Sequence, residues 1–233
     1  MVRLASHNEW LNMNITILCS DPGHPVSPRL QAWASRWNGH RVAIVQRAAE
    51  AKGGDLLFLV SCHEIIREDT RRCYRHVLVM HAADLPADRG WSPHVWAVLR
   101  GDGALTVSLL EAADGVDSGR IFRKLRIPLR GTEVCAEIND KLFDAELQLM
   151  DWAMVNIDSA VPDVQDESRA SYLRRRTAED SRLDPMQTIA AQFDLLRVAD
   201  ADRYPAFVEY RGRKYAFRMT PMEPLEDGES ANE

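Results

Sequence analysis

Two residues with the chemistry for proton transfer follow separate apolar runs. His81 ends the run HVLVMH (76–81), and Asp117 lies in the turn-rich segment ADGVDSG (113–119) that follows LTVSLLEA (105–112). In an open α/β sheet, ligands bind beyond the carboxyl ends of the strands, so we expect both side chains at that edge. A carboxylate beside an imidazole holds its tautomer and raises its basicity. The pair therefore predicts a site for acid–base chemistry.

Strand and helix signals alternate in the first half of the chain. Short apolar runs predict strands, and apolar residues at helical spacing predict helices, two of which begin with Ser-Pro and are followed by Gly. The predicted strands cover 14–20, 40–45, 55–62 and 76–81, and the predicted helices cover 27–37, 63–75 and 92–103. Near-continuous apolar strands are typical of a parallel sheet covered on both faces. We expect an α/β fold with an open, mostly parallel sheet and helices on both faces.

The second half of the chain predicts an appendage to this sheet. Residues 120–130 alternate apolar with basic residues, as a half-exposed edge strand does, and residues 132–157 form one long amphipathic helix. The expected C-terminal elements are a polar surface loop (158–185), a short helix (186–200) and a β-hairpin (204–219). The expected division is an N-terminal extension (1–12), a catalytic α/β domain (13–160), a C-terminal loop, helix and hairpin subregion (161–220) and a disordered acidic tail (221–233).

Composition and missing motifs exclude several classes of protein. The formal net charge of −6 disfavours binding to a phosphate backbone, which depends on Lys and Arg. No apolar run reaches the roughly 20 residues of a membrane span, no export signal is visible, and the four cysteines lie far apart, so we expect a cytoplasmic protein with reduced thiols. HEII (63–66) lacks the second histidine of a zinc protease, and no metal is predicted. GDGALT (101–106) precedes a strand instead of following one, and neither a P-loop nor a G-x-S-x-G elbow occurs.

The segments around His81 and Asp117 resemble the formyltransferase family, whose members use 10-formyltetrahydrofolate. HAADLPADRGWSP (81–93) is similar to the family signature N-x-H-x-S-x-L-P-x-x-x-G, and DGVDSG (114–119) is similar to its L-D-[ST]-G-like turn. YLRRRTAEDSRLD (172–184) resembles a segment of the sugar and tRNA formyltransferases. The resemblance spans roughly residues 14–219 and implies a Rossmann-like formyltransferase fold.

By this resemblance the reaction is formyl transfer from 10-formyltetrahydrofolate to an amine. The implied catalytic residues are His81, which stabilises the oxyanion or moves the amine proton, and Asp117, which orients His81. The implied cofactor-binding residues are Leu85, Pro86, Gly90, Glu111, Ala112 and Val116. The implied substrate-binding residues are Trp91, Arg89, Arg174 and Arg176, with Arg174, Arg175 and Arg176 facing a diphosphate because guanidinium suits phosphate oxygens.

Two signature positions differ in this chain. Val79 stands where the family has Asn, and Ala83 stands where it has Ser. The Asn normally helps to hold the oxyanion, so a replacement donor is needed. His94 and Ser61 are the candidates, from their places in the predicted topology.

The resemblance leaves more than one acceptor open. The variant HxxDLPxxRGWSP favours a nucleotide-linked amino sugar, such as a 4-amino-4,6-dideoxy sugar for a surface glycan or a pseudaminic-type sugar. A methionyl-tRNA formyltransferase would carry a larger, basic C-terminal barrel that holds RNA. The present sequence is acidic and ends after a short predicted hairpin, so tRNA is disfavoured as the acceptor. The alternatives are a formyltetrahydrofolate hydrolase, a methionyl-tRNA formyltransferase-like enzyme and a degenerate folate-binding protein. We expect a homodimer, with the edge strand near 120–130 and the hairpin as candidate surfaces.

Overall fold

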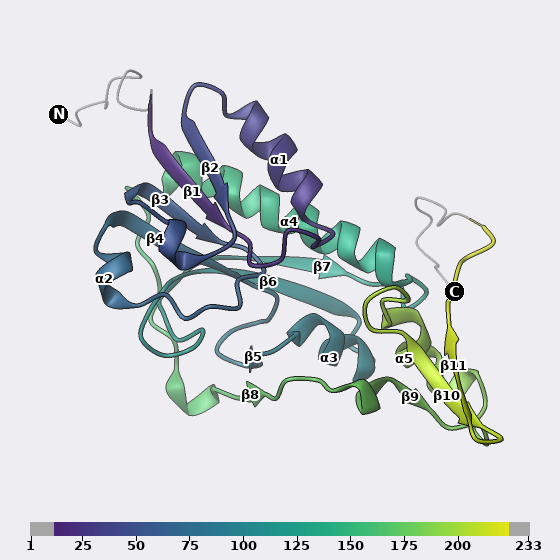
Figure 1. Ribbon diagram of the computed structural model, residues 1–233. Helices are drawn as coiled ribbons and strands as arrows, with labels where there is room; N and C mark the ends of the chain where they lie inside the picture. Colours follow the sequence, from purple (N-terminus) through teal and green to yellow (C-terminus); the bar gives the residue numbers. More distant parts are fainter. Residues whose placement is uncertain (1–11, 224–233) are drawn as a thin grey trace.

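A computed structural model of the chain describes residues 12–223 (Figure 1). The predicted N-terminal extension and acidic tail lie almost entirely outside the described residues, which exclude 1–11 and 224–233. Within the described part, one large sheet forms the centre of the molecule.

The large sheet has six strands in the order β2-β1-β3-β4-β6-β7. Its strands are β1 (Asn14–Leu18), β2 (Arg41–Val45), β3 (Gly54–Leu59), β4 (Tyr74–His81), β6 (Ala104–Glu111) and β7 (Ile121–Pro128). The first four strands are parallel to one another, whereas β6 runs antiparallel to both β4 and β7. The mostly parallel α/β fold is thus confirmed, and β7 lies at the sheet edge as its alternating pattern predicts.

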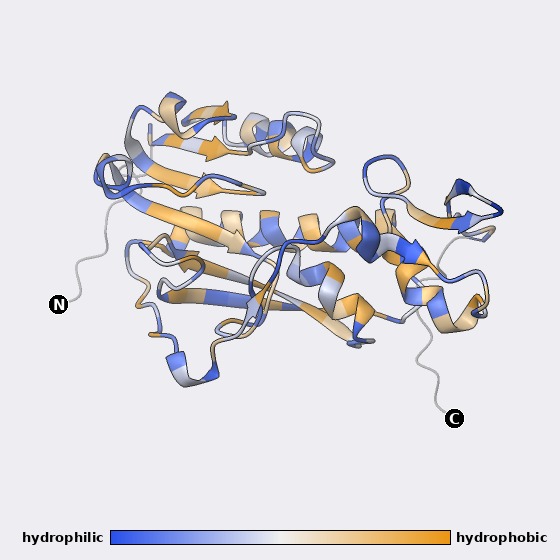
Figure 2. Ribbon diagram, turned by 60° about the horizontal axis from the view of Figure 1, so that its bottom comes forward, coloured by the Kyte–Doolittle hydropathy of each residue, from blue (hydrophilic) through white to orange (hydrophobic). Residues whose placement is uncertain are grey.

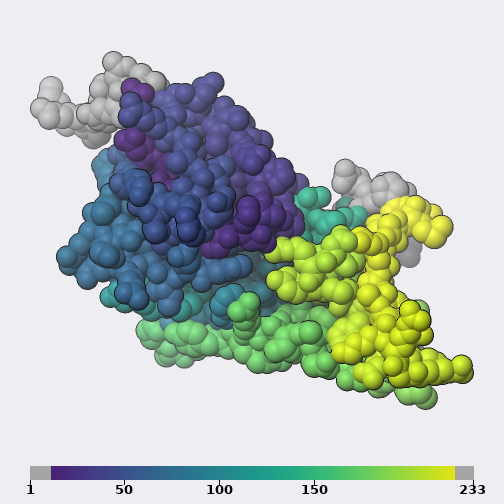
Figure 3. Space-filling model, in the orientation of Figure 1, coloured from purple at the N-terminus to yellow at the C-terminus, as the bar shows by residue number. Residues whose placement is uncertain are grey.

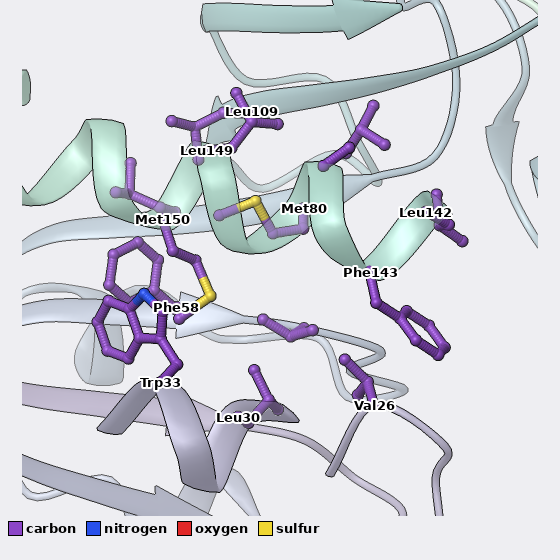
Figure 4. Close-up of a cluster of buried hydrophobic side chains, with 14 of the residues drawn as sticks. Val26, Leu30, Trp33, Phe58, Met80, Leu109, Leu142, Phe143, Leu149 and Met150 are labelled. Atoms are coloured by element: carbon purple, nitrogen blue, oxygen red, sulfur yellow. The ribbon is translucent and has the colours of Figure 1, made fainter. Parts of the chain in front are cut away.

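One face of the sheet is covered by α1 (Ser27–Arg36), α3 (Pro93–Leu99) and the long α4 (Cys135–Asn156). Helix α4 forms because Ile138, Leu142 and Leu149 recur at helical spacing, and all three are buried. Figure 4 shows α4 side chains packed over those of the sheet and of α1. Figure 2 shows that the strands beneath are largely apolar, as a covered sheet requires.

The helices α1 and α4 are also joined by polar contacts. Trp33 is buried in the core, and its Nε1–H donates to Asp151 at 2.6 Å. Arg29 of α1 pairs with Asp140 and Asp144 of α4. The indole fills core volume and still has its one polar group satisfied, which fixes how the two helices meet.

The opposite face is covered by shorter segments. They include the 3₁₀ turn η1 (Ala48–Glu50) and α2 (Glu68–Arg71). The helix predicted over 63–75 is therefore wrong except for its middle. Ile66 is buried against this face, which holds residues before α2 out of a helix, and Tyr74 already belongs to β4.

The C-terminal segment lies across the end of the molecule and projects from it (Figure 3). The loop predicted over 158–185 is irregular and makes two short strand pairings. In these, β5 (Arg89–Gly90) pairs with β8 (Tyr172–Leu173), and β9 (Arg182–Leu183) pairs with β10 (Ala206–Tyr210). Its 3₁₀ turns are η2 (Glu167–Arg169) and η3 (Ala178–Ser181).

The helix and hairpin that follow partly match expectation. The helix predicted over 186–200 shortens to α5 (Phe193–Val198), preceded by η4 (Ala190–Gln192). The predicted hairpin is confirmed as β10 (Ala206–Tyr210) and β11 (Arg213–Phe217). Val198 packs into the main core, so this segment shares the core of the sheet domain.

In the described part of the chain, no helix is both long enough and apolar enough to span a bilayer.

The buried stripe of α4 supplies a direct test of this core. Leu149 is fully buried, so Leu149→Ala should lower the free energy of unfolding by about 2–5 kcal/mol. Its neighbour Gln148 is exposed, and Gln148→Ala should change it by less than about 0.5 kcal/mol. Urea denaturation measures both, and equal effects of the two substitutions would contradict this packing.

Candidate active site

A cavity of about 460 Å³ lies where the parallel strands end. Its wall is built from the segments that follow β1, β3 and β4, the loop between β6 and β7, the start of α3 and the first turns of α4. His81 and Asp117 both line it. The volume is within the usual range of about 300–1,000 Å³ for small-molecule sites.

His81 and Asp117 face each other in this cavity. His81 Nδ1 lies 3.4 Å from Asp117 Oδ2, and both side chains are largely buried. This distance is an electrostatic contact longer than a good hydrogen bond. His81 Nε2 lies 2.9 Å from the carbonyl oxygen of Asp88, which can only accept, so Nε2 carries a proton. Both neighbours of the ring are therefore oxygen atoms that can accept a hydrogen bond.

A folded-back loop brings Asp117 to His81. Because β6 is antiparallel to β4, His81 lies opposite Ser108 and Leu78 lies opposite Glu111. The carboxyl end of β6 is therefore displaced from that of β4. This corrects the expectation that His81 and Asp117 meet because they follow the aligned carboxyl ends of two parallel strands. The loop 112–120 instead doubles back, with Asp117 at a φ of +52°.

Backbone and side-chain hydrogen bonds hold this loop. The Gly90 N–H donates to Asp117 Oδ2 at 2.9 Å. The buried Gln165 donates through Nε2 to the carbonyls of Asp117 and Gly119, at 2.8 and 2.7 Å. A Cβ on Gly119 would lie 1.8 Å from the carbonyl oxygen of Glu111, so only glycine fits there. The carboxylate is thus fixed before any ligand arrives.

Arg89 is the anchor behind this loop. Its side chain is fully buried, and its guanidinium donates to Gln165 Oε1 at 2.7 Å, to both carboxylate oxygens of Glu167 and to the Tyr172 hydroxyl. The hydrogen bonds with Glu167 raise the pKa of Arg89. Arg89 does not line the cavity, so the expectation that it contacts the acceptor is corrected: it positions Gln165 and through it Asp117.

The predicted cofactor residues separate into two groups. Gly90, Glu111, Ala112 and Val116 line the main cavity. Leu85 and Pro86 instead line a second cavity of about 280 Å³. Leu85 is buried against Leu110 and Ile121 on the other face of the sheet, so these two residues have a packing role, which corrects the expectation that they contact the cofactor.

The predicted acceptor residues of the 174–176 run are largely occupied. Arg174 pairs with Asp180 and lies over the Trp96 ring, with 5.0 Å from the guanidinium carbon to the ring centroid. Arg176 is half-buried and donates to the Asp180 carbonyl at 2.9 Å. Trp91 lines the cavity and is partly exposed, whereas Arg174 and Arg176 do not line it.

The two departures from the family signature are visible in the wall. Val79 lines the cavity with an apolar side chain, and Ala83 is buried with its carbonyl accepting from Ser108 at 2.7 Å. His94 and Ser61, the candidates to replace the missing Asn, both line the cavity. Which of them faces the reacting oxygen stays a prediction.

Three polar residues of the cavity form what we call the inner wall: His24, His94 and Glu146. Sequence reasoning named His94 as a candidate but missed His24 and Glu146. Burial raises the pKa of Glu146 to about 8 and is the main cause that lowers the pKa of His24 and of His94 to about 4. At neutral pH the inner wall is therefore mostly uncharged. Glu146 Oε2 is buried without a hydrogen-bond partner in the described part of the molecule.

The tautomer of His24 follows from its contacts. The Val26 N–H donates to His24 Nδ1 at 3.2 Å, so the neutral ring carries its proton on Nε2. The His24 ring also meets Phe143 edge-on, with 5.7 Å between centroids. The sequence signal for Glu146 was available, because a carboxylate four residues after Leu142 stands on the buried stripe of α4.

Between residues 12 and 223, no group of three or more His, Cys, Asp or Glu side chains could hold a metal ion.

Comparison with known proteins places the chain in a family. The model of the formyl transferase family matches residues 14–154. A curated methionyl-tRNA formyltransferase from Thiobacillus denitrificans is 33% identical over 114 residues, which is 49% of this chain and 37% of that protein. The chain spans half or less of the length of the curated relatives it matches.

Solved structures share the fold. A methionyl-tRNA formyltransferase from Clostridium thermocellum aligns over 91% of this chain and 94% of its own, with a TM-score of 0.76 and 22% identity. HypX from Aquifex aeolicus in complex with tetrahydrofolic acid aligns over 89% of this chain and 37% of its own, with a TM-score of 0.76 and 20% identity. A sugar N-formyltransferase from a Shewanella species aligns over 89% of this chain and 97% of its own, with a TM-score of 0.68 and 14% identity.

The fold is that of a formyltransferase domain. The chain belongs to the formyl transferase family.

Gln165 offers a test of how Asp117 is positioned. Gln165→Glu is nearly isosteric but replaces the donating amide nitrogen by an oxygen, which would face two carbonyl oxygens. We expect the loop to shift by about 1 Å and formyl transfer to fall roughly 10²-fold. The same change at the exposed Gln187 should leave the rate unchanged, and a Gln165→Glu variant as active as the parent would contradict the positioning role.

Glu146 predicts an unusual pH dependence of stability. Its pKa of about 8 lies above the ordinary value of 4.5, so its contribution is fully present below pH 4.5 and lost as pH rises to 8. Glu146→Gln removes this loss, and its stability relative to the parent should rise by on the order of 3 kcal/mol between pH 5 and pH 9. Urea denaturation of both proteins at the two pH values measures it, and parallel pH curves would refute the burial of an ionisable group.

Proposed function

We propose that the protein transfers a formyl group from 10-formyltetrahydrofolate to the amine of a nucleotide-linked amino sugar. The observation that carries this proposal is the His81–Asp117 contact of 3.4 Å inside a cavity formed by the family's signature segments. The catalytic roles below belong to the proposal.

His81 is the group that moves protons. An amine that attacks a formyl carbon must lose a proton, and negative charge develops on the formyl oxygen. With Nε2–H held by Asp88, His81 takes up the amine proton at Nδ1, and Asp117 stabilises the resulting imidazolium. The imidazolium then returns the proton to the donor nitrogen as its bond to the formyl carbon breaks. Asp88 holds the far side of the ring through its carbonyl at 2.9 Å, so the imidazole stays in place during the transfer.

The donor would occupy the part of the cavity around Gly90, Glu111 and Ala112. When bound, 10-formyltetrahydrofolate supplies an activated one-carbon group. The wall fits such a donor because Val79, Met80 and Ala112 offer apolar surface between the polar groups of the β6–β7 loop. The tetrahydrofolate complex of HypX, which shares this fold, supports the choice of donor.

The inner wall supports a sugar as the acceptor. His24, His94 and Glu146 present hydrogen-bonding groups without a full charge at neutral pH. Hydroxyl groups of a sugar ring satisfy such groups, and the unpartnered Glu146 Oε2 is one place for them. The fold is also that of a sugar N-formyltransferase.

A second acceptor has its own support. Curated relatives of this chain include methionyl-tRNA formyltransferases, and the exposed hairpin β10–β11 carries Arg211, Arg213 and Lys214 beside Tyr210 and Tyr215. Cationic and aromatic side chains together suit a single-stranded nucleic acid. Methionyl-tRNA is therefore the second candidate acceptor.

Substitution of the pair tests the chemistry. His81→Asn and Asp117→Asn should each lower the rate of formyl transfer by about 10²–10⁴-fold, because proton transfer and charge stabilisation are lost. His76 lies on the same strand and pairs with Asp158 at 3.0 Å outside the cavity, so His76→Asn is the matched control. A His81→Asn enzyme within a few-fold of the parent would remove His81 from the mechanism.

Mass spectrometry of acceptors identifies the substrate. The protein is incubated with 10-formyltetrahydrofolate and a panel of nucleotide-linked amino sugars, with methionyl-tRNA in a separate reaction. One formyl mass gained by one sugar supports the proposal, whereas formylated methionyl-tRNA supports the second candidate. Release of formate without an acceptor indicates a hydrolase. Binding of the folate with neither formylation of an acceptor nor release of formate indicates a degenerate site.

A further inference from the structure

Three side chains lie against one another at the rim of the main cavity. The Arg175 guanidinium carbon lies 4.7 Å from the centroid of the Trp91 ring, and the Trp91 and His63 rings are tilted by 39° with their centroids 5.8 Å apart. Trp91 and His63 both line the cavity, and Trp91 is 38% exposed. We call these three residues the rim stack.

The backbone fixes the rim stack in place. β5 and β8 pair in parallel, and the Trp91 N–H donates to the Leu173 carbonyl at 3.3 Å. A Cβ on Gly90 would lie 2.6 Å from that same carbonyl, so the two segments approach as closely as a glycine allows. Arg89 anchors β8 from beneath through Tyr172. Arg175 is therefore carried to the rim by a rigid segment.

Arg175 differs from the arginines on either side of it. Arg174 is neutralised by Asp180, and Arg176 donates to the Asp180 carbonyl and to Ser181. For residues 12–223, the contact found for the Arg175 guanidinium is the Trp91 ring, with no carboxylate and no hydrogen-bond acceptor. Its planar fork of N–H donors is thus available to an anion.

The charge of the cavity explains why an anion would bind at the rim. The described wall has neither Lys nor Arg, and besides the neutral Glu146 it carries the carboxylates of Glu64, Glu111, Asp114 and Asp117. Two of these are paired with arginines outside the wall, Glu111 with Arg120 and Asp114 with Arg71. Such a wall disfavours phosphate inside the cavity. An acceptor with a neutral ring and an anionic diphosphate would place the ring inside and the diphosphate outside.

We propose that the rim stack binds the diphosphate of the acceptor, with Arg175 as the residue that contacts phosphate oxygens. This inference rests on the proposed nucleotide-linked acceptor and names the residue that selects it. Stacking on Trp91 holds the guanidinium in one orientation, so less side-chain freedom is lost when phosphate binds. The tail carboxylates of the folate donor are the other anion that could reach the rim.

Direct binding measurements test the rim stack without turnover. Dissociation constants are measured by calorimetry for a panel of nucleoside diphosphates and for 5-formyltetrahydrofolate. Arg175→Ala should raise the dissociation constants of the nucleoside diphosphates that bind the parent by roughly 10- to 100-fold. It should leave the dissociation constant of the folate within about twofold of the parent value. The affinity of Arg175→Lys for nucleoside diphosphates should lie between those of the parent and of Arg175→Ala, because lysine keeps the charge but loses the planar set of N–H donors.

Arg126 supplies the matched control, since it is exposed on β7 and does not line the cavity. Arg126→Ala should leave both ligands unchanged. The proposal is overturned if no nucleoside diphosphate binds the parent, or if Arg175→Ala binds nucleoside diphosphates as tightly as the parent does. It is also overturned if this substitution weakens the binding of the folate instead. If nucleoside diphosphates bind through Arg175 but an acceptor without a nucleotide is formylated, the proposed function fails while the anion site stands.

Discussion

The structure of the site depends on one buried cation. Arg89 has no contact with solvent, and the carboxylate of Glu167 compensates its charge. Through Gln165 it fixes the backbone of the β6–β7 loop, and through Tyr172 it fixes β8. Without the Glu167 carboxylate the guanidinium would stay buried with no counter-charge, so this network resists rearrangement. The two segments that meet at the cavity are therefore held by the same side chain.

A second feature is the separation of charge around the cavity. Its inner wall is kept neutral by burial, which raises the pKa of Glu146 and lowers those of His24 and His94. Its cationic group, Arg175, stands outside on the rim. Burial favours the uncharged forms of the inner-wall groups, whereas a cation at the rim keeps contact with water. It matches an acceptor with an uncharged end and an anionic end.

The sequence predicted the elements that depend on local patterns. The apolar strands, the stripe of α4 and the hairpin were readable because hydrophobic periodicity acts over a few residues. The direction of β6 was not, since strand pairing depends on contacts distant in sequence. The role of Arg89 was also hidden, because the sequence does not distinguish a buried arginine from an exposed one. The place of Glu146 on the buried stripe of α4 was readable, but its lack of a partner was not. The pairing of His81 with Asp117 was predicted from the residues and their resemblance to a family, but the folded-back loop that achieves it was not.

The most direct test of the site is a crystal structure with 5-formyltetrahydrofolate, a stable isomer of the donor. We expect the folate in the main cavity with its formyl group near His81 and Asp117, within reach of a hydrogen bond of about 2.6–3.2 Å directly or through one water. The loop 112–120 should keep its conformation, because Gln165 and Arg89 already hold it. A folate bound in the second cavity beside Leu85 and Pro86, or with its formyl group turned away from His81, would contradict the assignment of the active site.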